Sequence, residues 1–149
     1  MLDGPRVYRQ EKLPQALPWE QVTALLGDID RTNAQGIRNH AMLLLIATYG
    51  LRSCEVVALK LDDIRWRSME IRLPQSKNDN VLTLPLTDGV AASLVDYLSK
   101  ARPASPQREV FLRVRAPLSA LKPTAVADVF QREARLGGLD IPCTGTHCL

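Results

Sequence analysis

The feature that most constrains the fold is an unbroken apolar run at residues 41–49, AMLLLIATY, followed directly by Gly50. This run is about half of the roughly 20 residues that a membrane-spanning helix needs, so we expect it inside a protein core. It belongs to a helix expected over residues 35–49, which Asn33 can cap and Gly50 can end. Because such a helix has almost no polar face, the rest of the chain must cover it on several sides.

The hydrophobic periodicity elsewhere predicts further helices and one β-hairpin around this central helix. The alternation of Met69, Ile71 and Leu73, and then of Leu82, Leu84 and Leu86, predicts the two hairpin strands. The expected helices cover residues 18–29, 53–60 with Ser53 as the cap, 90–98 with Val90, Leu94, Val95 and Leu98 as the apolar face, and 126–136 with Val126, Val129, Phe130 and Leu136, ended by Gly137 and Gly138. The predicted fold class is therefore mainly α with a small antiparallel β-sheet.

The length of 149 residues is enough for one domain with a hydrophobic core. With 46% hydrophobic and 23% charged residues, the composition is that of a globular protein and argues against a disordered or fibrous one. Residues 1–17 lack periodicity and are interpreted as a leader or interdomain linker, and residues 18–149 as the domain. The net charge of +3 permits a polyanionic partner but does not identify one.

The three cysteines, Cys54, Cys143 and Cys148, are odd in number and contain no C-x-x-C pair. A disulfide framework is therefore not expected, and a reducing compartment, the cytoplasm, is the predicted location. Cys143, His147 and Cys148 could form a partial metal site, but they lack the paired spacing of structural zinc ligands.

Three segments carry polar residues that stand out from these patterns. YGLRSCEVVAL at 49–59, followed by KLDDI at 60–64, places Arg52 and Glu55 at the start of a short helix. PQSKNDN at 74–80 puts Lys77 at the hairpin tip, ahead of LTLPL at 82–86, and GTHCL at 145–149 contains His147. Taken singly, each has an ordinary interpretation: a surface ion pair worth at most about 1 kcal/mol, a solvated lysine, and a buried or frayed histidine.

Taken together and in this order, the three segments resemble the boxes of the tyrosine recombinases of the phage integrase family, over about residues 14–149. The resemblance implies that Arg52 is the first catalytic arginine and that Glu55 orients it. It makes Lys77 the general acid toward the departing 5′ hydroxyl, and His147 the first residue of the H-x-x-R box, which hydrogen-bonds the phosphate or assists proton movement. An arginine suits the first role because its planar guanidinium can hold two non-bridging phosphate oxygens at once.

The resemblance also implies an activity and partners. A complete enzyme of this kind performs site-specific recombination or integration of double-stranded DNA through a 3′-phosphotyrosine intermediate. It needs no cofactor and no metal, and it acts with other recombinase protomers in a synaptic complex, expected to be a tetramer. In the family's order, the second arginine, the histidine or tryptophan box and the nucleophilic tyrosine all follow His147, whereas Tyr8, Tyr49 and Tyr97 precede it. We therefore expect a chain truncated within the H-x-x-R box and inactive alone.

Tyr49 is interpreted as a core residue and Tyr97 as lying on a helix surface. Three alternatives for the function stay open. The chain could be a non-catalytic DNA-binding or recombinase-partner fragment, a degenerate reading frame without a function, or a helical transcription regulator. In the last case the helix over residues 125–136 would read the major groove, and Gln131, Arg132 and Arg135 are its few candidate base-reading residues.

Overall fold

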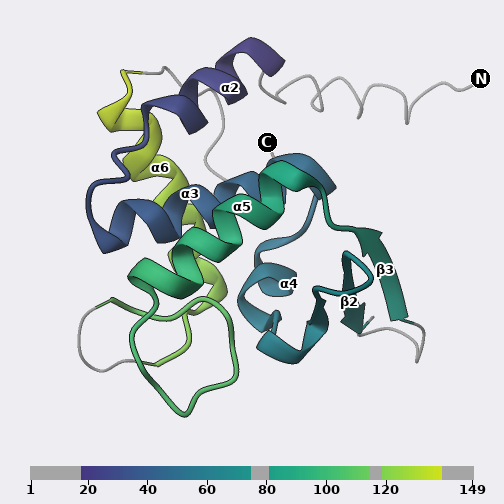
Figure 1. Ribbon diagram of the computed structural model, residues 1–149. Coiled ribbons are helices and arrows are strands. Elements are labelled where there is room, and N and C mark those ends of the chain that lie inside the picture. Colours follow the sequence, from purple (N-terminus) through teal and green to yellow (C-terminus); the bar gives the residue numbers. More distant parts are fainter. Residues whose placement is uncertain (1–17, 75–80, 115–118, 139–149) are drawn as a thin grey trace, which may run out of the picture.

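The computed structural model describes residues 18–74, 81–114 and 119–138. Helices surround a central helix, α3, and a small sheet lies beside them (Figure 1). Within the described residues, no helix is long and apolar enough to cross a membrane. The elements in chain order are α2 (Trp19–Asp28), α3 (Ala34–Tyr49), α4 (Ser53–Ala58), η2 (Leu61–Asp63), β1 (Ile64–Arg65), β2 (Glu70–Pro74), β3 (Val81–Pro85), α5 (Asp88–Asp96), the π-helical turn η3 (Tyr97–Ala101) and α6 (Pro123–Leu136). The predicted fold class, mainly α with a small antiparallel sheet, is confirmed.

Helix α3 is the centre of the fold, as its apolar run predicts. The Asn33 side chain accepts a hydrogen bond from the Gly36 N–H at 2.8 Å, and Gly50 ends the helix in the left-handed region with φ 68°. Helices α2, α4, α5 and α6 and the turn η3 all pack against α3. Its residues Met42, Leu43 and Leu45 are fully buried. The expected cap, stop and burial on several sides are therefore confirmed.

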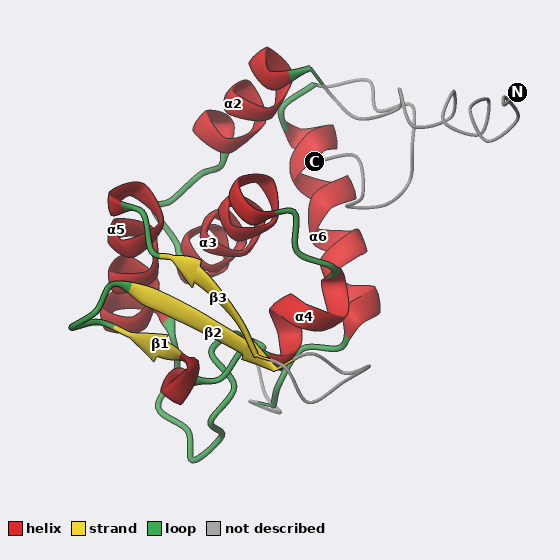
Figure 2. Cartoon of the chain, turned by 90° about the vertical axis from the view of Figure 1, so that its right-hand side faces the viewer, coloured by secondary structure: helices red, strands yellow, loops and turns green. Residues whose placement is uncertain are grey.

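The sheet is antiparallel with the strand order β1-β2-β3 (Figure 2). In β2 and β3, Ile71 pairs with Leu84, and Ile71 also pairs with Ile64 of β1, so one face packs on the core. The predicted hairpin is confirmed. Strand β1 was not predicted, because two residues are too few to show an alternating pattern. Met69, which the alternation placed in a strand, lies in the β1–β2 turn with φ 55°.

Local boundaries around α4 differ from the prediction. Arg52, with extended backbone dihedrals, is the N-cap of α4, and Ser53 is its first residue. The helix ends at Ala58 instead of residue 60, because the chain turns at Leu59 and Lys60 pairs with Glu109 in an isolated antiparallel bridge. This bridge requires extended backbone, which ends the helix.

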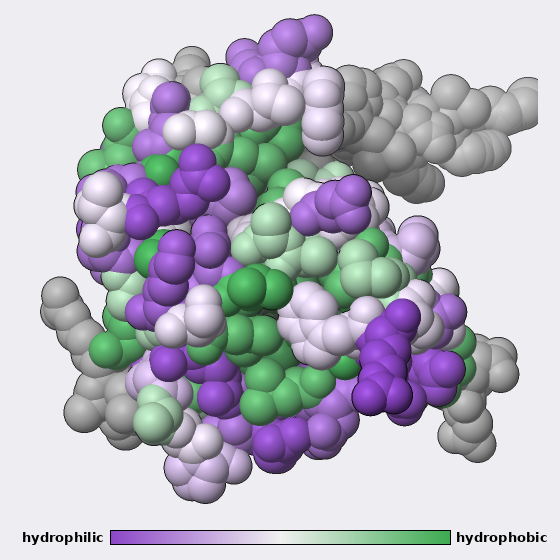
Figure 3. Space-filling model, in the orientation of Figure 1, coloured by the Kyte–Doolittle hydropathy of each residue, from purple (hydrophilic) through white to green (hydrophobic). Residues whose placement is uncertain are grey.

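In the second half of the chain, the burial of several side chains differs from what the periodicity indicated. Tyr97 is fully buried, and its ring stacks on Phe111 at 5.3 Å between centroids, so its predicted surface position is wrong. Conversely, Val95 and Leu136 are 49% and 68% exposed, although the pattern placed both on apolar helix faces. Helix α6 ends at Gly137 as expected. In the space-filling view, hydrophobic residues gather in the middle of the visible face, among hydrophilic ones (Figure 3).

Candidate active site

The corner between α3 and α4 presents Arg52 to solvent. Gly50 adopts φ 68° and ψ 31°, a conformation that costs a residue with a Cβ roughly 1–2 kcal/mol, and its N–H bonds the Ile46 carbonyl at 2.8 Å. Leu51 follows with 5% exposure, so its side chain anchors the corner in the core. Arg52 is exposed. The Gly-Leu-Arg order thus supplies a turn, an anchor and a displayed cation at three successive positions.

Glu55 fixes the backbone of this corner. Its Oε1 atom accepts a hydrogen bond from the Arg52 N–H at 2.8 Å, which satisfies one of the free N–H groups at the start of α4. The Glu55 carboxylate thus contacts the backbone of Arg52. It therefore fixes the position of the backbone from which the Arg52 side chain extends.

The same corner is tied to the sheet. The Tyr49 hydroxyl donates to the Pro85 carbonyl at 2.6 Å and accepts from the Thr87 N–H at 3.2 Å. These two bonds join the end of α3 to the end of β3, and β3 pairs with β2 up to Pro74 and Val81. The predicted Lys77 belongs to the connection between these two strands, at residues 75–80, which lie outside the described residues.

His147 lies outside the described residues as well, in the segment 139–149 that follows α6. The same is true of Cys143 and Cys148, so the partial metal site stays untested. Within the described part of the chain, no group of three or more metal-ligating side chains is present, and Cys54 is an exposed free cysteine. Of the four predicted site residues, the structure therefore places Arg52 and Glu55 together.

Two of the tyrosines have structural roles. Tyr97 accepts a hydrogen bond from the Leu112 N–H at 3.0 Å, and burial raises the pKa of its hydroxyl. The hydroxyl of Tyr49 is held between Pro85 and Thr87. Tyr49 is half-buried against the core, in agreement with its interpretation as a core residue.

A buried polar cluster was missed at the sequence level. Arg38, Asn39 and Glu133 are 5%, 0% and 7% exposed, and they connect α3 to α6. Burial lowers the pKa of Arg38, although a guanidinium stays protonated in proteins. The available signal was the polar run of Arg38, Asn39 and His40 inside an otherwise apolar helix. Neighbouring His40 bonds Ser93 Oγ through Nδ1 at 2.8 Å, and burial lowers its pKa to about 4.

Comparison with known proteins places this chain in a family. The Phage integrase family matches residues 15–149. The Sinorhizobium fredii protein y4rA, named as an integrase/recombinase, is 41% identical over 91% of this chain and 33% of its own length. Tyrosine recombinase XerD of Listeria innocua is 34% identical over 62% of this chain and 31% of its own length. The chain thus spans about a third of the length of these two curated relatives.

Solved structures agree on the fold. A XerH site-specific recombinase bound to a palindromic difH substrate superimposes with a TM-score of 0.75, over 93% of this chain and 40% of that one, at 21% identity. The catalytic core of lambda integrase superimposes with a TM-score of 0.67, over 89% of this chain and 80% of that one, at 15% identity. The described elements therefore have a fold similar to that of the lambda integrase catalytic core. With a match that covers most of its length, the chain belongs to the phage integrase family.

Proposed function

We propose that this domain handles the scissile DNA phosphate in site-specific recombination, with Arg52, Lys77 and His147 as its phosphate-contacting residues. The observation that carries the proposal is the corner at residues 50–52, where a left-handed glycine and a buried leucine display an arginine whose backbone Glu55 holds. An arginine fixed at its base can offset the charge that develops on a phosphate during in-line attack. A structure of lambda integrase bound to DNA, with a TM-score of 0.64, supports double-stranded DNA as the partner.

The roles of the other two residues follow from their chemistry. Lys77, whose titratable ammonium group is carried by the long flexible side chain of lysine, would protonate the departing 5′ hydroxyl. His147 would hydrogen-bond the phosphate or move a proton. Neither role requires a cofactor or a metal. Since DNA is the substrate, the bacterial cytoplasm is the compartment where we expect the protein to act.

The nucleophile belongs to the complete recombinase in this proposal. In the described residues, the hydroxyls of Tyr49 and Tyr97 are bonded within the fold. We therefore expect the 149-residue chain to bind DNA without cleaving it, and the complete protein to form a 3′-phosphotyrosine bond within an assembly of protomers, expected to be a tetramer. A dimer of lambda integrase bound to a core site supports a multimeric assembly on DNA.

The DNA contact can be tested on the chain itself. Fluorescence anisotropy with a labelled duplex, repeated over a range of salt concentrations, gives the slope of log K against log salt. Arg52→Ala is expected to reduce this slope by about one unit, because one phosphate contact and its released counterion are lost. Lys100→Ala is the matched control, since Lys100 is exposed and pairs with Asp96 at 3.4 Å on another part of the surface. Equal slopes for both variants would contradict a phosphate contact at Arg52.

Strand cleavage needs a second assay. The complete recombinase is incubated with a nicked suicide duplex, in which a covalent adduct cannot religate. We expect an adduct that depends on Arg52 and Lys77, and none with the 149-residue chain. A sequence-specific gel shift by the chain without an adduct from the complete protein would instead favour the non-catalytic partner role.

A further inference from the structure

A connected set of polar side chains lies inside the core between α3 and α6, and the phosphate chemistry proposed above does not use it. This set, the buried triad, consists of Arg38, Asn39 and Glu133. Arg38 donates to Asn39 Oδ1 through Nε at 3.1 Å and through Nη2 at 2.8 Å. Asn39 Nδ2 in turn donates to Glu133 Oε2 at 2.7 Å. The amide of Asn39 therefore lies between a buried cation and a buried carboxylate and bonds both.

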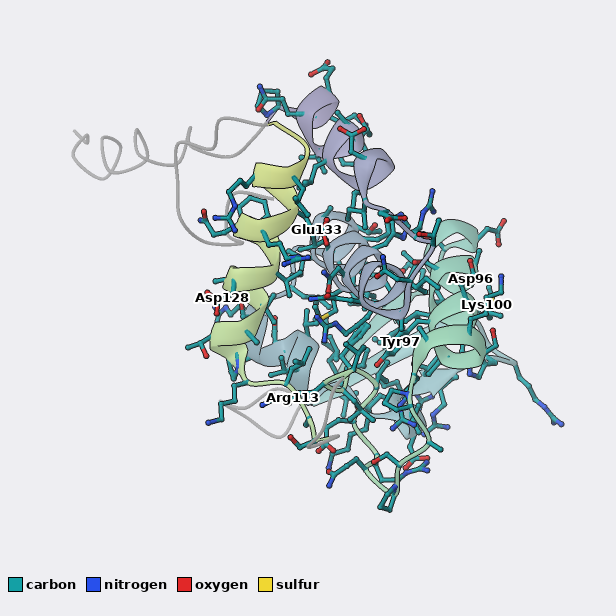
Figure 4. The ribbon with its side chains drawn as sticks, turned by 90° about the vertical axis from the view of Figure 1, so that its left-hand side faces the viewer. Asp96, Tyr97, Lys100, Arg113, Asp128 and Glu133 are labelled. Atoms are coloured by element: carbon teal, nitrogen blue, oxygen red, sulfur yellow. The ribbon has the colours of Figure 1, made fainter. Side chains whose placement is uncertain are left out.

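The triad is also hydrogen-bonded to the segment at residues 110–112. Arg38 Nη1 donates to the Leu112 carbonyl at 3.3 Å, and the Leu112 N–H donates to the Tyr97 hydroxyl at 3.0 Å. Figure 4 shows Glu133 on the side of α6 that faces α3. One chain of hydrogen bonds thus runs from α6 through α3 to the segment at residues 110–112 and on to η3.

Stability alone does not account for this arrangement. Burying charges carries a desolvation cost, and well-packed apolar replacements of buried ionic groups are often as stable or more stable. The other buried side chains of α6, such as Val126, Val129 and Phe130, are apolar, and the hydrophobic effect that favours their burial is non-directional. A hydrogen bond of fixed length and direction adds what apolar packing lacks, because it selects one register of α6 against α3.

This register bears on the site because α6 also packs against α4, whose N-cap is Arg52. Helix α3 continues through Gly50 into the same residue. We propose that Asn39 and Glu133 are positioning residues of the recombinase site, which hold α6 in one register against α3 and so keep α4 and the backbone of Arg52 in place. This inference rests on the proposed function for its role in DNA cleavage, but the structural tie itself does not.

The triad allows a test in which the tie and the charge are separated. Asn39→Asp keeps both bonds from Arg38 but sets a carboxylate against Glu133, so the tie to α6 is lost. Glu133→Gln removes the charge but keeps an acceptor for Asn39. The double variant N39D/E133Q restores the bond with its direction reversed, from the Gln side-chain amide to the Asp carboxylate, and keeps the net charge of the triad.

Two measurements are made on these variants. In the 149-residue chain, hydrogen exchange of the α6 amides reports how firmly α6 is held. In the complete recombinase, single-turnover cleavage of the suicide duplex is measured together with the DNA dissociation constant. Asn39→Asp is expected to speed exchange in α6 and to lower the cleavage rate about 10- to 100-fold, as for other small displacements of a reacting group, with DNA affinity little changed. The double variant is expected to restore both, and Glu133→Gln to cleave like the wild type even if it is less stable.

A merely structural role gives a different pattern. Cleavage rates that follow the unfolding free energy across all three variants, or a double variant that regains normal α6 exchange without regaining cleavage, would overturn the proposal. Unchanged α6 exchange in Asn39→Asp would overturn the tie itself. If the wild-type recombinase forms no covalent adduct, the proposed function fails, whereas the exchange experiment on the chain still decides whether the triad holds α6. If Asn39→Asp does not fold, Glu133→Gln and the double variant carry the comparison.

Discussion

Gly36 lies in the first turn of α3, where the chain passes close to the preceding loop. A Cβ atom built on this residue would lie 1.6 Å from the Asp30 carbonyl oxygen and 2.8 Å from its carbon. Both distances are far inside van der Waals contact, and the obstacle is backbone, which cannot rotate away. Gly36→Ala therefore requires the loop before α3 to move.

The cost of this movement can be worked from the bonds that the loop makes. Asp30 accepts from Thr32 Oγ1 at 2.6 Å, and the Asn33 cap accepts from the Gly36 N–H at 2.8 Å. Losing the cap costs about 1 kcal/mol, and forcing extra volume into a packed site costs about 1–3 kcal/mol. The better helix propensity of alanine returns about 1 kcal/mol. The expected loss in the free energy of unfolding is about 1–3 kcal/mol, by balance of these terms.

Gly27→Ala is the matched control, because it is the same substitution in a helix with open space around the new methyl group. No atom lies within 4 Å of a Cβ at Gly27. We expect this variant to be more stable than the wild type by up to about 1 kcal/mol. Urea unfolding of both variants, followed by circular dichroism, gives the two free energies. A Gly36→Ala variant as stable as the wild type would refute the argument from the close backbone approach.

Three further predictions concern stability. Tyr97→Phe leaves the buried Leu112 N–H without its acceptor and is expected to lower the unfolding free energy by about 1–3 kcal/mol in urea unfolding. Met69→Gly relieves a positive φ of 55° at a partly exposed side chain. This variant is expected to gain about 0.5–1 kcal/mol in the free energy of unfolding, which a higher melting temperature would show. Burial lowers the pKa of His40 from 6.5 to about 4. The neutral, buried imidazole therefore contributes fully to the free energy of unfolding above pH 6.5, and this contribution is lost as the pH falls toward 4. A His40→Gln variant should show a shallower loss of melting temperature across this range, and parallel curves for both proteins would contradict the assignment.

Much of the local structure and the candidate site could be predicted because their causes are local. The cap at Asn33, the stop at Gly50 and the hairpin alternation depend on a few neighbouring residues, and the structure contains all three. The Gly-Leu-Arg corner could be predicted for the same reason, since a left-handed turn, a buried anchor and a displayed cation need only consecutive positions. The roles of Lys77 and His147 stay predictions from the order of the motifs.

The sequence by itself therefore determined the helices, the hairpin, the buried central helix and the family pattern around Arg52. Only the tertiary structure decided which polar residues meet: Asn39 and Glu133 bond across 94 positions, and Tyr97 reaches Leu112 across 15. Periodicity identifies the apolar face of a helix, but it carries no information on which distant donor or acceptor will face a given side chain. That choice depends on how the helices dock, because a polar group can be buried in this core only where another element brings it a partner.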